Sequence, residues 1–143
     1  PSAKGRGVVG LKPGAKGLIM PDNKAEQWRL TRGTPDVVSP LIYEEEVYLN
    51  RENGSIACLD AKTGEQYYSE RAHAQTYRAS PVAADGKVYV TARDGTVSVI
   101  KAGSKFEVLF KNKINDQLTA SPVLSNGRIY LRGFKSLYAI GSK

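Results

Sequence analysis

Short apolar runs separated by turn residues are the dominant pattern of this 143-residue chain. Runs such as Val88-Tyr89-Val90 are apolar at consecutive positions rather than at alternate ones, which is typical of strands in a sheet that is covered on both faces. No stretch of the sequence carries a sustained helical period with capping residues. The pattern therefore predicts an all-β protein whose sheets stack face to face.

The same residue pairs recur along the chain with a period of 41 positions. A Ser-Pro pair and an apolar-Tyr pair each appear three times in the same register: Ser39-Pro40, Ser80-Pro81 and Ser121-Pro122, then Val47-Tyr48, Val88-Tyr89 and Ile129-Tyr130. Such a period is the sequence signature of a repeat architecture, in which each copy buries its apolar faces against its neighbours.

Asx-Gly pairs divide each copy into strands. Two-residue type I′ hairpins favour these pairs because both turn residues need a positive φ, so we expect such turns at Asp85-Gly86, Asn126-Gly127, Asn53-Gly54 and Asp94-Gly95. In the middle copy the predicted strands cover about residues 79–84, 87–92, 96–101 and 106–111. A four-stranded antiparallel meander of about 41 residues predicts the blades of a β-propeller.

The chain holds about 3.5 such blades, all in one propeller domain. Residues 1–30 are predicted to be the last two strands of a preceding blade, residues 31–70 and 71–112 two complete blades, and residues 113–143 an incomplete three-stranded blade. Closed propellers have about four to eight blades. The ring therefore needs either the remaining blades of a longer polypeptide, which we favour, or further copies of the chain, with the Trp28 strand of one copy completing the last blade of the next.

Charge and reactive residues limit the possible functions. The formal net charge of +7 permits a polyanion or nucleic acid as partner, but the basic residues are scattered, so nucleic acid is a secondary alternative. With one cysteine (Cys58) and one histidine (His73), an internal disulfide and a cysteine-based zinc site are excluded. The acidic run Glu44-Glu45-Glu46 is interpreted as a solvated turn. No segment is apolar enough to span a membrane, and the first residues are not expected to be a signal peptide.

One segment carries a family signature. Residues 59–68 contain an Asp, a Thr-Gly turn and an aromatic residue four positions after the Gly (Asp60, Thr63, Gly64, Tyr68), and this resembles the repeat motif of the pyrroloquinoline-quinone-like (PQQ-like) propellers. We interpret these four residues as structural. Cys58 and Tyr68 depart from the usual Ala and Trp of the motif, which looks like the non-enzymatic members of the outer-membrane-assembly-lipoprotein type.

The resemblance implies a function without catalysis. Quinoprotein dehydrogenases of the same superfamily bind PQQ and calcium, usually beside an adjacent cysteine pair and a catalytic Asp, and this chain has no such pair. We therefore expect no catalytic residue, cofactor or metal site in these blades, and a scaffold that binds a protein or peptide in the envelope of a bacterium, in the periplasm or outside the cell. The alternative is a fragment of a PQQ-dependent oxidoreductase.

The predicted binding residues lie in the loops that join one blade to the next, residues 31–36, 71–78 and 112–118. Such loops gather at one end of a propeller axis, and binding specificity is commonly placed there. Donors and aromatic area for a polar or anionic ligand would come from Arg32, His73, Gln75, Tyr77, Arg78, Asn115 and Gln117.

Overall fold

Thirteen strands in four antiparallel sheets make up the fold, which comes from a computed structural model describing residues 7–21 and 23–141. The first sheet contains β1 (Val8–Leu11) and β2 (Glu26–Leu30). The second contains β3 (Leu41–Tyr43), β4 (Glu46–Asn50), β5 (Ser55–Asp60) and β6 (Gln66–Arg71), and the third β7 (Val82–Ala84), β8 (Lys87–Thr91), β9 (Thr96–Lys101) and β10 (Val108–Lys113). The fourth contains β11 (Val123–Ser125), β12 (Arg128–Arg132) and β13 (Leu137–Ile140).

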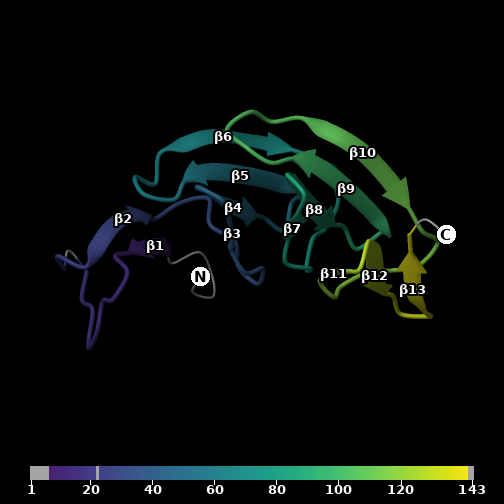
Figure 1. The fold of residues 1–143 in the computed structure, drawn as a ribbon, viewed down its shortest axis with the longest axis horizontal. Helices are drawn as coiled ribbons and strands as arrows, with labels where there is room; N and C mark the ends of the chain where they lie inside the picture. Colours follow the sequence, from purple (N-terminus) through teal and green to yellow (C-terminus); the bar gives the residue numbers. More distant parts are fainter. Residues whose placement is uncertain (1–6, 22, 142–143) are drawn as a thin grey trace.

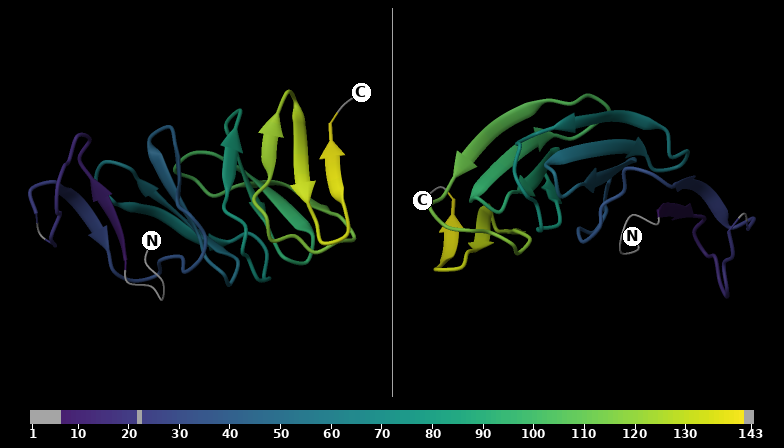
Figure 2. Two further views of the ribbon diagram at one scale, coloured as in Figure 1. Left: turned by 90° about the horizontal axis from the view of Figure 1, so that it is seen from below. Right: turned by 180° about the vertical axis from the view of Figure 1, so that it is seen from behind.

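Within each sheet the strands pair in chain order, so every sheet is a meander. Figure 1 shows the four sheets following one another along an arc, with β6 and β10 on its outer side and β3 and β7 on its inner side. The two further views in Figure 2 place β1–β2 and β11–β13 at opposite ends of the same arc. The prediction of four-stranded propeller blades in a partial ring is confirmed.

The apolar core lies between successive sheets rather than within one layer. The largest cluster joins the second sheet to the third and includes Tyr48, Ile56, Val88 and Ile100, all fully buried. A second cluster lies between the first and second sheets, and a third between the third and fourth. Every residue of β9 from Thr96 to Ile100 is buried, as expected for a strand covered on both faces.

The repeated Ser-Pro pairs connect the inner edges of neighbouring sheets. The backbone nitrogen of Ser39 donates to Ser80 Oγ (3.0 Å), and the backbone nitrogen of Ser80 donates to Ser121 Oγ (2.9 Å). The strand predicted at 79–84 begins only at Val82 because Ser80 uses its N–H in this contact and Pro81 has no N–H to give. The 41-residue period is thus a hydrogen-bonded seam between sheets.

Two of the four Asx-Gly turns differ from the prediction. Asp85-Gly86 and Asn126-Gly127 have a positive φ at both residues, as type I′ requires. At Asn53-Gly54 and Asp94-Gly95 only the glycine has a positive φ, and four residues separate the strands. The physical reason is the Asx side chain, since Asp94 Oδ1 accepts from the backbone nitrogen of Thr96 (3.1 Å) and so favours an Asx turn.

The turn between β5 and β6 is built around the carboxylate of Asp60. Its Oδ1 accepts hydrogen bonds from the backbone nitrogens of Lys62 (2.8 Å) and Thr63 (2.7 Å) and from Thr63 Oγ1 (3.0 Å). The Thr63 backbone bond contributes most to a pKa of about 2 for this carboxyl group. Gly64 has a φ of +74°, and a Cβ there would stand 2.6 Å from Trp28 Cγ, so the Trp28 ring of the first sheet packs on this turn.

Tyr68 has the position in β6 that Trp28 has in β2. Trp28 pairs with Gly10 on the neighbouring strand of the first sheet, and Tyr68 pairs with Cys58 on the neighbouring strand of the second sheet. The Tyr68 ring meets the Phe106 ring, in the turn between β9 and β10, edge to face, with centroids 5.4 Å apart. Each of these aromatic residues therefore docks on the next sheet along the chain.

Candidate functional site

Loops and turns at one end of the sheets bond to one another through their backbones. The backbone nitrogen of Tyr77 donates to the carbonyl of Glu52 (3.0 Å), that of Arg93 to Thr76 (2.8 Å), that of Leu118 to Arg93 (3.1 Å) and that of Phe134 to Gln117 (3.1 Å). We call this surface the loop platform, made of residues 51–54, 71–78, 92–95, 112–118 and 133–136. Because turns and interblade loops alternate in this bonding, the platform is one continuous structure.

Glycines allow the turns of the platform to approach the loops. A Cβ on Gly95 would stand 2.5 Å from the carbonyl oxygen of Asp116 and closer still to that of Ile114. One repeat earlier, a Cβ on Gly54 would overlap the carbonyl oxygen of His73. These contacts involve backbone atoms, so a side chain could not be accommodated by a rotamer change. The close approach fixes the loops relative to the sheets.

Asp94 binds side chains from two interblade loops of the platform and from the first residue of β9. Its Oδ2 accepts from His73 Nε2 (3.2 Å), Thr96 Oγ1 (3.1 Å) and Lys113 Nζ (3.3 Å). Burial by itself raises the pKa of Asp94, but the hydrogen bonds from His73, Thr96 and Lys113 outweigh it and hold the pKa at about 2. The carboxylate is therefore ionised and fully engaged near neutral pH.

Asp116, in the interblade loop at 112–118, is a second carboxylate that accepts several hydrogen bonds on the platform. Its Oδ1 accepts from the backbone nitrogen of Gln117 (2.8 Å), and its Oδ2 from the backbone nitrogens of Lys135 (2.9 Å) and Ser136 (3.2 Å) and from Tyr138 Oη (3.2 Å). Desolvation raises the pKa of Asp116, yet these donors lower it overall, beginning with the Lys135 amide. A buried carboxylate with four donors is a structural anchor for the turn at 133–136.

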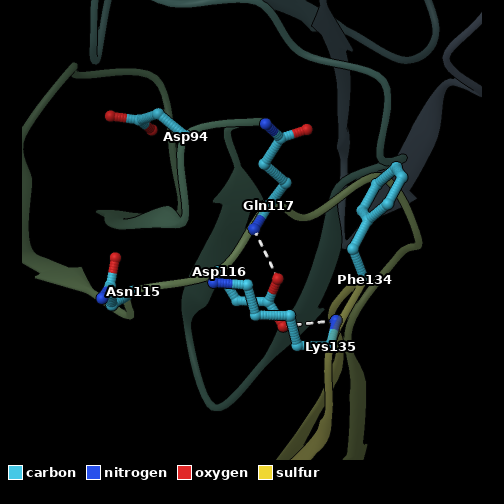
Figure 3. Close-up of a pocket in the computed structure, with 6 residues that line it drawn as sticks. All are labelled: Asp94, Asn115, Asp116, Gln117, Phe134 and Lys135. Carbon is cyan, nitrogen blue, oxygen red and sulfur yellow. Dashed lines mark hydrogen bonds between the residues drawn. The ribbon is translucent and has the colours of Figure 1, made fainter.

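Two cavities open on the platform at equivalent positions of the repeat. The larger has a volume of about 460 Å³ and is lined by Asp94, Asn115, Asp116, Gln117, Phe134 and Lys135. The smaller, about 350 Å³, is lined by Glu52, Asn53, Arg71, Ala74, Gln75 and Thr76. Figure 3 shows Asp116 bonded to the backbones of Gln117 and Lys135, with Phe134 beside them. Each cavity thus lies between an interblade loop and a turn.

The structure brings most of the predicted binding residues onto the platform. Gln75 lines the smaller cavity, and Asn115 and Gln117 line the larger one. His73 bonds to Asp94, and Arg78 pairs with Glu52 at 2.8 Å, so both are engaged within the protein. Arg32 is exposed in the loop 31–36, which reaches the edge of the platform, where Arg51 Nε donates to the carbonyl of Gly33.

The prediction that Tyr77 offers aromatic surface to a ligand is wrong, because the Tyr77 side chain is fully buried. Its backbone forms a β-bridge with Ala92, and its side chain belongs to the core between the second and third sheets. The repeat in the sequence indicates this burial, because the residue 41 positions later is the apolar Leu118, which is also fully buried.

The sequence pattern does not predict four residues that line the larger cavity: Asp94, Asp116, Phe134 and Lys135. It predicts only a turn at Asp94, and Phe134 and Lys135 lie where the third copy is one residue shorter. Among the described residues, no group of three or more His, Cys, Asp or Glu side chains could hold a metal ion. Cys58 is buried in the core, and no helix in the described part of the chain could cross a membrane.

The model of one protein family, described as outer membrane protein assembly factor BamB, matches residues 16–105, which is more than half of the chain. No curated protein matches the chain significantly.

Solved structures share the fold at low sequence identity. BamB from Moraxella catarrhalis is 16% identical, with a TM-score of 0.69 over 82% of this chain and 37% of that chain. The computationally designed Ika4 protein is 14% identical, with a TM-score of 0.68 over 81% of this chain and 72% of that chain. A europium-containing methanol dehydrogenase is 18% identical, with a TM-score of 0.52 over 62% of this chain and 19% of that chain. The chain therefore spans little more than a third of the length of that BamB.

Proposed function

Because the chain belongs to the family of the outer membrane protein assembly factor BamB, we propose that it is a non-catalytic propeller module that binds a protein or peptide partner through the loop platform. The family is named for the assembly of outer membrane proteins, and this supports a place for the chain in the bacterial envelope, in the periplasm or outside the cell. The partner in this proposal contacts the interblade loops and the turns at 92–95 and 133–136.

The observation that carries the proposal is the backbone bonding of the platform. Binding costs less when the surface is already ordered, because no loop has to lose conformational freedom on contact. Interblade loops of the second and third sheets bond to the turns on either side, so the two cavities are held open in fixed positions. The same surface presents amide side chains and an exposed aromatic ring, which suit a protein partner.

The platform is poorly suited to acid–base chemistry. A general base works best when its pKa is near the pH of the reaction, whereas Asp94 has a pKa of about 2 and Asp116 a lowered one. Asp94 and Asp116 each accept hydrogen bonds from several donors of the loops and turns. They therefore support a structural role, and the binding function does not require them to react.

The proposal includes completion of the arc by further blades, from a longer polypeptide or from further copies. In it, residues 1–30 are the last two strands of a preceding blade, residues 31–70 and 71–112 are two complete blades, and residues 113–143 are an incomplete three-stranded blade, all in one propeller domain. The likeness to BamB over 37% of that chain supports a larger ring. An enzymatic parent, such as a quinoprotein oxidoreductase, is the competing function, since a methanol dehydrogenase has the same fold.

Site-specific photo-cross-linking tests the binding function. The photoreactive residue p-benzoylphenylalanine replaces Gln117 on the platform in one variant and Lys105, in the turn at the opposite end of the third sheet, in the matched control. Both are incubated with envelope extract of the organism that encodes the chain, and the captured protein is then purified and rebound. We expect one discrete protein from Gln117 and none from Lys105. Equal capture at both positions, or dye-linked alcohol oxidation by the purified protein, contradicts the proposal.

A further inference from the structure

Charge is distributed unequally between the two ends of the sheets. The loop platform contains six Lys or Arg residues and three Asp or Glu residues. The turns at the opposite end of the second to fourth sheets, residues 44–45, 61–65, 85–86, 102–107 and 126–127, contain two Lys residues and five Asp or Glu residues. The surplus of positive charge therefore lies on the loop platform.

All three platform carboxylates are engaged inside the protein. Glu52 pairs with Arg78 at 2.8 Å, and Asp94 pairs with Lys113 at 3.3 Å. Asp116 is surrounded by backbone amides and a tyrosine hydroxyl. None of these carboxylates is left to neutralise the remaining cations of the platform.

Three exposed cations on the platform have no carboxylate within ion-pair distance among the described residues: Arg71, Arg93 and Lys135. Arg71 lines the smaller cavity, and Lys135 lines the larger one. Arg93 lies on the turn whose backbone bonds to both interblade loops, through Thr76 and Leu118. The three charges are therefore carried by separate elements of one surface.

Uncharged groups beside these cations can recognise a polypeptide. Gln75, Asn115 and Gln117 bring amide donors and acceptors to the cavity walls, which suit the polar groups of an extended backbone. Phe134 is 63% exposed at the larger cavity and gives one apolar contact. Exposed aromatic rings and arginines are the residue types that contribute most to protein interfaces.

We propose that the loop platform recognises an acidic peptide segment, in which separate carboxylates meet Arg71, Arg93 and Lys135 and an apolar side chain contacts Phe134. This inference rests on the proposed function and specifies the chemistry of its partner. A nucleic acid is disfavoured because its phosphates are closely and regularly spaced, whereas Asp94 and Asp116 lie on the wall of the larger cavity and repel such a chain. A peptide can place its charges at the cations and leave the carboxylates uncontacted.

Fluorescence anisotropy with synthetic peptides tests this proposal on the intact chain. The probe is a labelled 12-residue peptide of Glu and Gly with one central Leu, compared with the same peptide containing Gln in place of Glu and with a single-stranded oligonucleotide of equal charge. We expect the Glu peptide to bind more tightly than the other two. Its dissociation constant should rise about 2- to 5-fold for each of Arg71→Ala, Arg93→Ala and Lys135→Ala, the range typical of exposed ion pairs.

Matched controls remove cations from the opposite end. Lys62→Ala and Lys105→Ala should leave the dissociation constant unchanged, although the net charge falls equally, and added salt should weaken binding. Equal losses at both ends, equal binding of the Gln peptide, or tighter binding of the oligonucleotide overturns the proposal. If no acidic peptide binds while Gln117 still captures one protein, the acidic specificity fails and the binding function stands; if neither occurs, both fail.

Discussion

Substitution of Gly95 by Ala tests whether the close approach of turn and loop holds the platform together. Gly95 has a φ of +91°, and its new Cβ would meet the backbone carbonyls of Ile114 and Asp116. Gly86 is a matched control, because it also has a positive φ (+67°) but no atom lies within 4 Å of a Cβ there. Both changes carry the cost of a left-handed residue, about 1–2 kcal/mol. Only Gly95→Ala adds overpacking, about 1–3 kcal/mol more.

The two variants are compared by urea unfolding, followed by far-UV circular dichroism and by tyrosine and tryptophan fluorescence. We expect Gly86→Ala to lower the free energy of unfolding by about 1–2 kcal/mol and Gly95→Ala by about 2–5 kcal/mol. The loop at 112–118 has to move away from the turn in the second variant, so binding to the platform should weaken there and persist in Gly86→Ala. Equal losses of stability for the two variants would refute the reasoning, because both glycines have a positive φ and only Gly95 lacks space for a Cβ.

Two further comparisons use equivalent positions of the repeat as their controls, and a third compares Asp94→Asn with the wild type, with thermal or urea unfolding as the measurement in each. Trp28→Ala should lower the free energy of unfolding by about 2–4 kcal/mol because it removes a packed ring. Phe110→Ala, at the equivalent but exposed position, should lower it by less than about 0.5 kcal/mol. Equal losses would contradict the claim that Trp28 stabilises the contact between the first and second sheets. Ser80→Ala should lower the free energy of unfolding by about 1 kcal/mol, because it removes the hydroxyl that accepts from the backbone nitrogen of Ser39 in the preceding copy. Ser39→Ala keeps its donating N–H and should be nearly neutral. Asp94 has a folded pKa of about 2, below its ordinary value, so its stabilising effect is present above about pH 4 and is lost as the pH falls toward 2; Asp94→Asn should therefore lose less stability over this range than the wild type, and parallel pH profiles would count against the network.

The sheets could be predicted from the sequence because their residues repeat. A period of 41 fixes the strand order, and apolar residues at consecutive positions identify strands that are covered on both faces. Turn type was less predictable, since Asn53-Gly54 and Asp85-Gly86 are similar pairs in different backbone conformations. The outcome depends on whether the Asx side chain bonds to the backbone two residues later, as Asn53 does to Ser55 (3.1 Å).

The candidate site was predictable in location but not in composition. The interblade loops were expected to gather at one end, and the structure places Gln75, Asn115 and Gln117 there. The role of Asp116 could not be found in the sequence, because its donors come from a turn about twenty residues later where the third copy is shorter. Contacts between different copies depend on the packing of sheets, which a period alone does not describe.

One register sets both the packing of the sheets and the composition of the platform. Phe110 of β10 pairs with Val99 of β9, in the same way as Trp28 and Tyr68 pair with the neighbouring strands of their sheets. The Phe110 side chain is nevertheless 59% exposed. Trp28, by contrast, is covered by the turn that follows β5, where its Nε1 donates to the carbonyl of Ala61 (2.9 Å). Docking therefore proceeds in one direction along the chain, and each blade added in that direction brings one more turn and one more interblade loop to the platform. Because these loops vary between copies while the seam and the docking aromatic recur, a larger ring can gain binding specificity without any change in how its blades pack.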